Sequence, residues 1–224
     1  FSVPGDKIDV IPNGVEAMPA LDDEFVQRTR LRYARPEDHL VFYVGRLVYE
    51  KGVHVLLDAV PRVLADVPQT RFVIAGDGYY VGVLREKAGN MGLGQVVSFA
   101  GHVSDRERDA LYAAADVVVF PSLYEPFGIV ALEGMARGTP VVASDTGGLA
   151  EVIQHERTGI KVYPGSAESL AWEIKRVLCD PGLRDFISRR GREEALTRFG
   201  WDAVAASTRS VYRRVLDEAS SVHW

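Results

Sequence analysis

Two glutamates eight positions apart give the clearest chemical signal in this sequence. Glu125 precedes a helix that we predict to start at Phe127 and to run to about Arg137, and Glu133 lies about two turns inside that helix. Between them, Gly128 leaves the backbone N–H groups of the first helical turn uncovered, and those amides together with the helix dipole attract an anion such as phosphate. The stretch therefore predicts phosphate-binding amides flanked by two acceptors for sugar or ribose hydroxyls.

A second loop supplies positive charge. Gly45 and Gly52 frame a segment that contains Arg46 and Lys51. A guanidinium can bind a phosphate with two parallel hydrogen bonds, whereas an ammonium acts as a point charge. Taken alone, these residues could be solvated loop cations, and each glutamate could serve only helix stability or solubility. Taken together, they favour a diphosphate site.

Other candidates are weaker. The segment 76–78 contains Gly76, Asp77 and Gly78, but the next glycine is Gly82, so the dinucleotide fingerprint G-x-G-x-x-G is not met. We interpret this segment as a turn after a strand, with Asp77 as a minor ligand candidate. Of the five histidines, His102 is the best placed for a ligand, and none has trustworthy metal-ligand spacing. The sequence therefore predicts no metal site, and it contains no Walker or nucleophile-elbow motif.

The elements that would position these residues alternate regularly. Short apolar runs predict six strands, and amphipathic segments predict helices between them. Because most strand segments are apolar throughout, we expect a doubly wound parallel sheet, an α/β Rossmann-like fold. The glycine-bearing loops follow strands, so they gather at the ligand-binding carboxyl edge. The predicted strands are 40–44, 72–75, 96–100, 117–120, 140–143 and 159–163.

The ends of the chain are less regular. Residues 7–11 predict a short strand, and residues 22–33 are a helix candidate whose apolar pattern is poor. Segments 183–199 and 201–216 predict two C-terminal helices, the second with one apolar face whose partner the sequence leaves open.

Composition narrows the classes of function. The 224 residues, 47% hydrophobic and 25% charged, suit one large domain or one domain with extensions. The net charge of -5 and the lack of a basic, aromatic-rich stretch argue against nucleic acid as a partner. The single cysteine, Cys179, excludes an intrachain disulfide framework and fits a reducing, cytoplasmic compartment. No apolar run approaches the roughly 20 residues of a membrane span; peripheral membrane contact stays open.

The combined motifs resemble a known family. The chain is similar to the C-terminal, donor-binding domain of retaining glycosyltransferases with the GT-B fold, in the large group called family 4, which includes glycogen-synthase-like enzymes. The likeness runs through most of residues 7–178. Single pieces are common, but the set is specific. It comprises segments 11–15, 45–47, 50–52, 76–78, 101–103, 115–116, 121–122, 138–142 and 147–149, together with Glu125 and Glu133.

The resemblance implies a role for each candidate. Arg46 and Lys51 would neutralise the nucleoside diphosphate as it leaves, Glu125 would hold donor-sugar hydroxyls, and Glu133 would hold the ribose. The donor would be a UDP-, ADP- or GDP-sugar, with no metal and no other cofactor. Further donor contacts would come from Gly45, Phe127, Gly128, Ile129 and Val130, and, near the base, from His102 and Val103.

The resemblance also implies a missing half. Residues 1–15 would close an N-terminal domain, residues 16–200 would form the nucleotide-sugar-binding domain, and residues 201–224 would pack back on the absent domain. The acceptor, a glycan or a small molecule, would bind mainly there, so the isolated chain would be inactive. Two alternatives stay open: a sugar-nucleotide 2-epimerase with the same fold, and a non-catalytic sugar-nucleotide-binding module.

Overall fold

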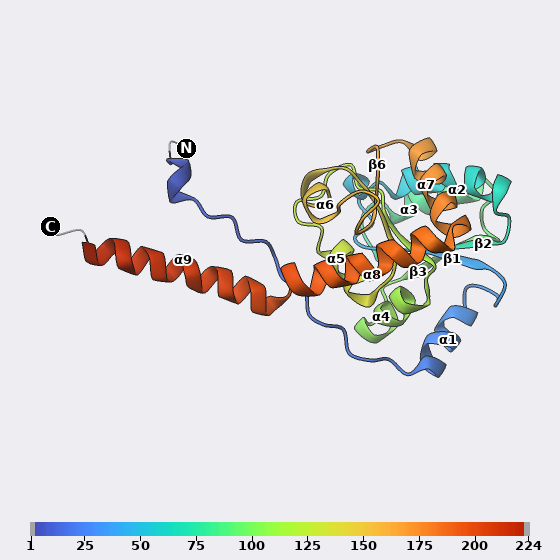
Figure 1. Cartoon of the computed structure of the whole chain (residues 1–224). Coiled ribbons are helices and arrows are strands. Elements are labelled where there is room, and N and C mark those ends of the chain that lie inside the picture. The colour runs from blue at the N-terminus through green and yellow to red at the C-terminus, as the bar shows by residue number, and fades with distance from the viewer. Residues whose placement is uncertain (1–2, 222–224) are drawn as a thin grey trace.

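A six-stranded parallel sheet forms the centre of the computed structural model, which describes residues 3–221 (Figure 1). The strand order is β3-β2-β1-β4-β5-β6, so the chain winds outward from β1 and then outward from β4 on the other side. This confirms the predicted doubly wound α/β fold. The strands are β1 His39–Val44, β2 Thr70–Ala75, β3 Val97–Gly101, β4 Val117–Phe120, β5 Val141–Ser144 and β6 Ile160–Val162.

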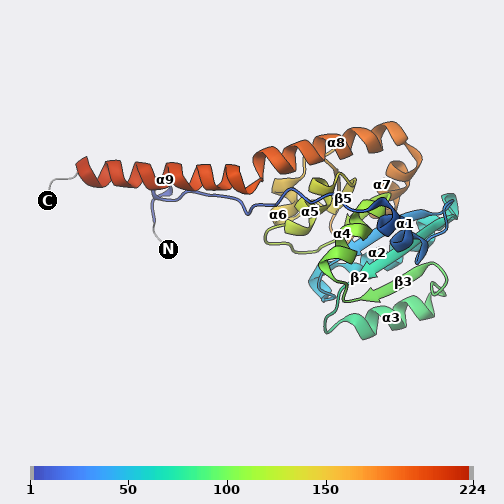
Figure 2. The same cartoon turned by 90° about the horizontal axis from the view of Figure 1, so that it is seen from below.

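Helices cover both faces of the sheet because its strands are apolar on both sides. In β1, Val41 and Tyr43 join one buried cluster, and Leu40 and Phe42 join the other. The first cluster packs under α2 Val53–Asp66, α3 Val81–Asn90 and α7 Ala167–Cys179. The second lies under α1 Asp23–Leu31, α4 Asp105–Ala114, α5 Ile129–Arg137 and α6 Gly147–Val152, and Figure 2 shows α3 and α8 on opposite sides of the body.

The two C-terminal helices behave differently. Helix α8 Pro181–Arg198 packs on α5, whereas α9 Trp201–Ser221 projects away from the body (Figures 1 and 2). The N-terminal segment runs beside α9, and the two are joined by an ion pair between Arg214 and Asp9. We call the N-terminal segment and α9 together the arm. At its base, the Val15 amide donates to the Phe199 carbonyl at 2.8 Å.

Two local predictions were wrong. Residues 7–11 form no strand: Gly5–Lys7 is a short 3-10 helix, and the residues after it run extended without a ladder partner, with Ile8 and Val10 exposed. Helix α5 starts at Ile129 rather than Phe127, because Gly128 has a left-handed φ of 77° and caps the helix. Glu133 consequently lies about one turn, not two, inside the helix.

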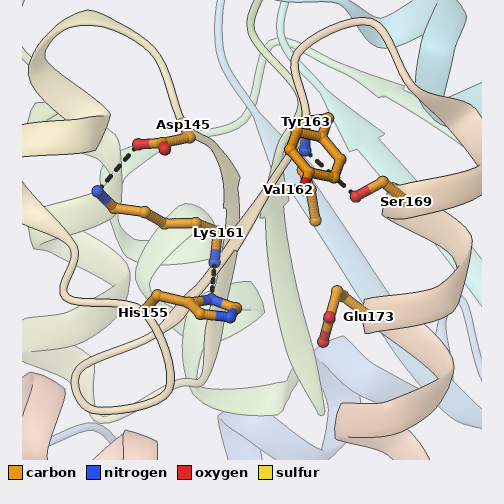
Figure 3. A pocket seen from close by; sticks show the side chains of 7 residues that line it. All are labelled: Asp145, His155, Lys161, Val162, Tyr163, Ser169 and Glu173. Atoms are coloured by element: carbon orange, nitrogen blue, oxygen red, sulfur yellow. Dashed lines mark hydrogen bonds and ion pairs between the residues drawn. The ribbon is translucent and has the colours of Figure 1, made fainter.

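The exposed edge of the sheet at β6 is closed by side chains (Figure 3). The Lys161 amide donates to Nδ1 of His155 at 3.0 Å, and the Tyr163 amide donates to Oγ of Ser169 at 3.2 Å. Lys161 Nζ also pairs with Asp145 at 2.9 Å. An open strand edge can pair with another chain, so these contacts protect β6. The hollow of about 410 Å³ that they line lies beside β6, two strands away from β4.

Candidate functional site

The connections after β1 and β4 diverge at the centre of the sheet. These strands are neighbours, yet the chain leaves β1 for α2 on one face and leaves β4 for α5 on the other. Such a switch point leaves a crevice at the carboxyl ends of the strands, the place where ligands of these sheets bind. A hollow of about 250 Å³ lies there, lined by Tyr43, Val44, Gly45, Arg46, Lys51, Phe120, Ser122, Glu125 and Val130.

Lys51 and Glu125 meet across this crevice. Their Nζ and Oε2 atoms are 2.5 Å apart, and the side chains are only 15% and 8% exposed. Ser122 Oγ also donates to the same carboxylate oxygen at 3.4 Å. An ammonium has three donors, so Lys51 can keep Glu125 and still offer N–H groups to an anion.

The loops that carry this pair are locked to each other. The Leu123 amide donates to the Glu50 carbonyl at 2.8 Å. Gly52 has a φ of 66°, and a Cβ there would lie 1.9 Å from the Pro121 carbonyl oxygen. Only glycine fits this position, so Gly52 fixes the approach of the two loops.

Arg46 contrasts with Lys51. Its guanidinium is exposed and makes no hydrogen bond or ion pair with any residue from 3 to 221. Its backbone is held from below, since the buried Tyr43 hydroxyl donates to the Arg46 carbonyl at 3.2 Å. Burial, together with the nearby Glu125 carboxylate, raises the pKa of Tyr43 far above its usual range, so the hydroxyl stays protonated and can donate. The crevice therefore presents one uncommitted cation on a fixed backbone.

The start of α5 supplies free amides on the opposite wall. Gly128 caps the helix without a side-chain hydrogen bond, and its carbonyl accepts from Ala131 and Leu132. The Ile129 and Val130 amides donate to no acceptor in the part of the chain that the structure describes, whereas Phe127 lies outside the helix with 63% of its surface exposed. These amides suit an anion or a hydroxyl oxygen.

Two glycines that the sequence analysis gave no role support this wall. The Gly148 amide donates to the Glu125 carbonyl at 2.8 Å. A Cβ on Gly147 would lie 2.2 Å from that carbonyl oxygen, and one on Gly148 would lie 2.5 Å from the Phe127 carbonyl carbon. The Gly-Gly pair therefore lets two backbones touch behind the site, and its sequence signal was the doubled glycine after a predicted strand.

Glu133 sits one turn further along α5 and is partly buried. Oε2 accepts a hydrogen bond from the Tyr112 hydroxyl at 3.1 Å, and Arg108 Nε lies 3.9 Å away. Burial raises the pKa of Glu133, and Arg108 and the Tyr112 hydroxyl act in the opposite direction. Sequence reasoning did not identify Tyr112, because a buried tyrosine on an amphipathic helix carries no signal that separates it from ordinary core.

The residues after β2 and β3 lie further out. Asp77 closes its own turn, since its side chain accepts from the Gly78 amide at 2.7 Å. His102 is exposed and Val103 packs against the core, and neither lines the 250 Å³ hollow. Their turn leads into α4, which carries Arg108 and Tyr112 to Glu133. The sequence-predicted base contacts thus remain a prediction.

Residues 3–221 contain neither a metal-binding cluster nor a membrane-spanning helix. Within that range no three or more His, Cys, Asp or Glu side chains gather as a group that could hold a metal ion. None of the helices in the same range has the length and apolar character needed to cross a membrane.

Comparison with known proteins places these features in a wider group. The family model described as "Glycosyl transferases group 1" matches residues 28–194. An uncharacterized glycosyltransferase of Methanocaldococcus jannaschii is 39% identical over 97% of this chain and 56% of its own length. A glycogen synthase of Mycobacterium tuberculosis is 39% identical over 92% of this chain and 48% of its own length. The chain thus spans about half the length of the curated relatives it matches.

Solved structures agree with the sequence relatives. Anabaena HepE in complex with UDP and glucose superposes with a TM-score of 0.82 at 27% identity, over 99% of this chain and 59% of that one. The C-terminal domain of a glycosyl transferase group 1 family protein from Francisella tularensis superposes with a TM-score of 0.72 at 26% identity. That alignment covers 84% of this chain and 99% of the Francisella domain.

Proposed function

The chain belongs to the glycosyl transferases group 1 family, and we propose that it binds a nucleoside-diphosphate sugar whose sugar is transferred to an acceptor with retention of anomeric configuration. Its sheet is the Rossmann-like half of a GT-B fold. The observation that carries the proposal is the crevice between β1 and β4. There an uncommitted Arg46, the Lys51–Glu125 pair and Val130 line one hollow, and the free amides of Ile129 and Val130 begin the helix beside it.

The proposed chemistry follows from the charges at this crevice. When the bond between the anomeric carbon and the diphosphate oxygen breaks, both electrons stay on the diphosphate. Prepositioned cations and amides stabilise that growing negative charge most effectively in a site that excludes water. Arg46 and Lys51 would thus do the work that a divalent metal does in other transferases, and the transfer would be metal-independent.

The two glutamates would divide the remaining contacts. Glu125, held by Lys51, would accept hydrogen bonds from hydroxyls of the donor sugar and so position the anomeric carbon of that sugar. Glu133 would accept hydrogen bonds from the ribose hydroxyls. The amides of Ile129 and Val130 would bind sugar or phosphate oxygens, and His102 and Val103 would lie near the base.

We also propose that a further domain completes the enzyme, since the relatives are about twice as long. Residues 1–15 and α9 would contact that domain. In support, Trp201, Tyr212 and Leu216 expose 52%, 66% and 68% of their surface on α9. The acceptor would bind mainly on the other domain, so the 224-residue chain would bind donor without turning it over.

Calorimetric titration of the chain with UDP, ADP and GDP tests the proposal. UDP comes first because HepE was solved with it, and GDP is included because a Mycobacterium tuberculosis relative is named as GDP-mannose-dependent. We expect weak binding of at least one nucleotide, and weaker binding by Arg46→Ala. No heat from any of the three at millimolar concentration would contradict the proposal.

A further inference from the structure

The hydroxyl of Tyr112 is the strongest directed contact on Glu133. It lies 3.1 Å from Glu133 Oε2 and 3.1 Å from the Val130 carbonyl oxygen. A phenol has one proton to donate, and an ionised carboxylate is a stronger acceptor than a neutral carbonyl. Arg108 carries the opposite charge nearby but makes no hydrogen bond to Glu133. Its Nε is 3.9 Å from Oε2 and has no hydrogen-bond partner among the described residues.

Tyr112 is itself held rigidly. Its side chain is fully buried, and its ring meets the Phe42 ring edge-on at 5.4 Å. The Thr139 hydroxyl donates to the Tyr112 carbonyl at 2.6 Å. Gly134 brings α5 close enough for this contact, because a Cβ there would lie 2.9 Å from Val118 and 3.5 Å from the Tyr112 ring. The hydroxyl therefore has one position, set by the core.

The contact leaves one carboxylate oxygen open. Oε2 of Glu133 is engaged by Tyr112, whereas Oε1 accepts no hydrogen bond from residues 3–221. A carboxylate that receives two neighbouring hydroxyls needs a fixed orientation and its negative charge. Tyr112 supplies the orientation by its hydrogen bond, and the same bond favours the ionised form of a group that burial disfavours.

From this geometry we propose that Tyr112 is a positioning residue for ribose recognition: it orients Glu133 so that the free carboxylate oxygen meets the vicinal hydroxyls of the nucleotide. The inference rests on the proposed function, because it assigns the ribose to Glu133. It adds a residue from α4, one layer behind the ligand, that would decide between ribose and a sugar without those hydroxyls.

The test compares UDP with 2′,3′-dideoxy-UDP as calorimetric ligands for the parent chain and for Tyr112→Phe. The variant keeps the ring and removes one oxygen. We expect UDP affinity to fall about 3- to 10-fold, the range for one net hydrogen bond, while affinity for the dideoxy ligand stays the same. Because the readout is a ratio between two ligands on one sample, a partly unfolded sample does not imitate it.

A double-mutant cycle measures whether Tyr112 acts through Glu133. In a Glu133→Ala background, Tyr112→Phe should cause no further loss of UDP affinity, because Tyr112 acts through that carboxylate. Equal losses for both ligands, or an undiminished loss without Glu133, would overturn the inference and leave the proposed function standing. A parent chain that binds UDP and dideoxy-UDP equally would also overturn it. No nucleotide binding by the parent chain would overturn both.

Discussion

Glu125 and Glu133 lie in surroundings that compensate a buried carboxylate in different ways. On the side of the Lys51–Glu125 pair, two opposite charges neutralise each other at 2.5 Å. On the side of α5, the Glu133 carboxylate has a neutral hydroxyl as its hydrogen-bond donor and a guanidinium only at 3.9 Å. Glu125 thus has its counter-charge without a ligand, whereas Glu133 keeps one carboxylate oxygen open to a ligand.

This difference separates stability from binding. A buried pair is harmful to the fold when one partner is removed, because the other charge is left uncompensated. A partly buried carboxylate with a raised pKa is already unfavourable in its ionised form at neutral pH. Removing one partner of the Lys51–Glu125 pair should therefore damage the fold and the site together, whereas a substitution at Glu133 should damage the site without destabilising the fold.

The largest effect is expected for Lys51→Ala. Its removal leaves Glu125 buried without its counter-charge, which should lower the free energy of unfolding by about 3–5 kcal/mol. Urea denaturation measures this loss. The double variant Lys51→Ala/Glu125→Ala should recover much of the stability without recovering diphosphate binding. A single variant as stable as the parent would show that the pair is not buried in solution.

Arg46→Ala should break the link between the two properties. The guanidinium has no partner among residues 3–221, so we expect the stability to change by less than about 0.5 kcal/mol. Diphosphate affinity should nevertheless fall by about 1.5–3 kcal/mol, the range for hydrogen bonds to charged groups. Calorimetry and denaturation on one preparation test both. Arg62→Ala, an exposed arginine on α2, is the matched control and should change neither.

Ser169→Ala examines a polar contact away from both glutamates. It removes the acceptor of the Tyr163 amide at the β6 edge, and we expect a loss of about 0.5–1.5 kcal/mol in stability. Hydrogen exchange of the Tyr163 amide should accelerate, and nucleotide affinity should stay unchanged. A change in nucleotide affinity would mean that the β6 edge and the crevice are coupled, so that effects on stability and on binding could not be separated by position.

The smallest expected change has the opposite sign. Burial raises the pKa of Glu133 above 4.5, so the folded state binds this proton more tightly than the unfolded state does. The contribution of Glu133 to the free energy of unfolding should therefore fall as the pH rises through the raised pKa, and Glu133→Gln should escape that loss. We expect the variant to be slightly more stable at neutral pH, with the gap closing in acid.

Denaturation curves at several pH values measure this gap. A gap that widens toward low pH would contradict the assigned direction. In the same variant, UDP affinity should fall while stability rises slightly, whereas in Lys51→Ala both affinity and stability should fall.

The sequence was sufficient for the fold because the signals for its elements are local. Each strand of the sheet is a short apolar run followed by a glycine or a polar turn, and α4 begins at a local capping box between Ser104 and Glu107. The run at 7–11 failed for the same reason: its apolar residues read as a strand, but no neighbouring strand pairs with them.

The sequence named candidate residues for the site but not the contacts between them. Lys51 and Glu125 were both named, yet their direct pairing joins positions 74 residues apart and depends on how tightly Gly52 packs. Tyr112 reaches Glu133 across two helices, and periodicity describes each helix separately. The left-handed conformation of Gly128 shifted the helix start, because a glycine at that place can equally begin a turn or sit in the first turn.

The junction at Val15 and Phe199 has a mechanical consequence. Both polypeptide connections between the body and the arm pass through it, with Gly14 pressed against the face of the Trp201 ring, where a Cβ would lie 2.6 Å from ring carbon. The N-terminal segment and α9 thus form a paired extension that is attached to the body at one junction. A force that tilts these two segments therefore reaches the body through this junction, and the tilt changes the direction of both segments together.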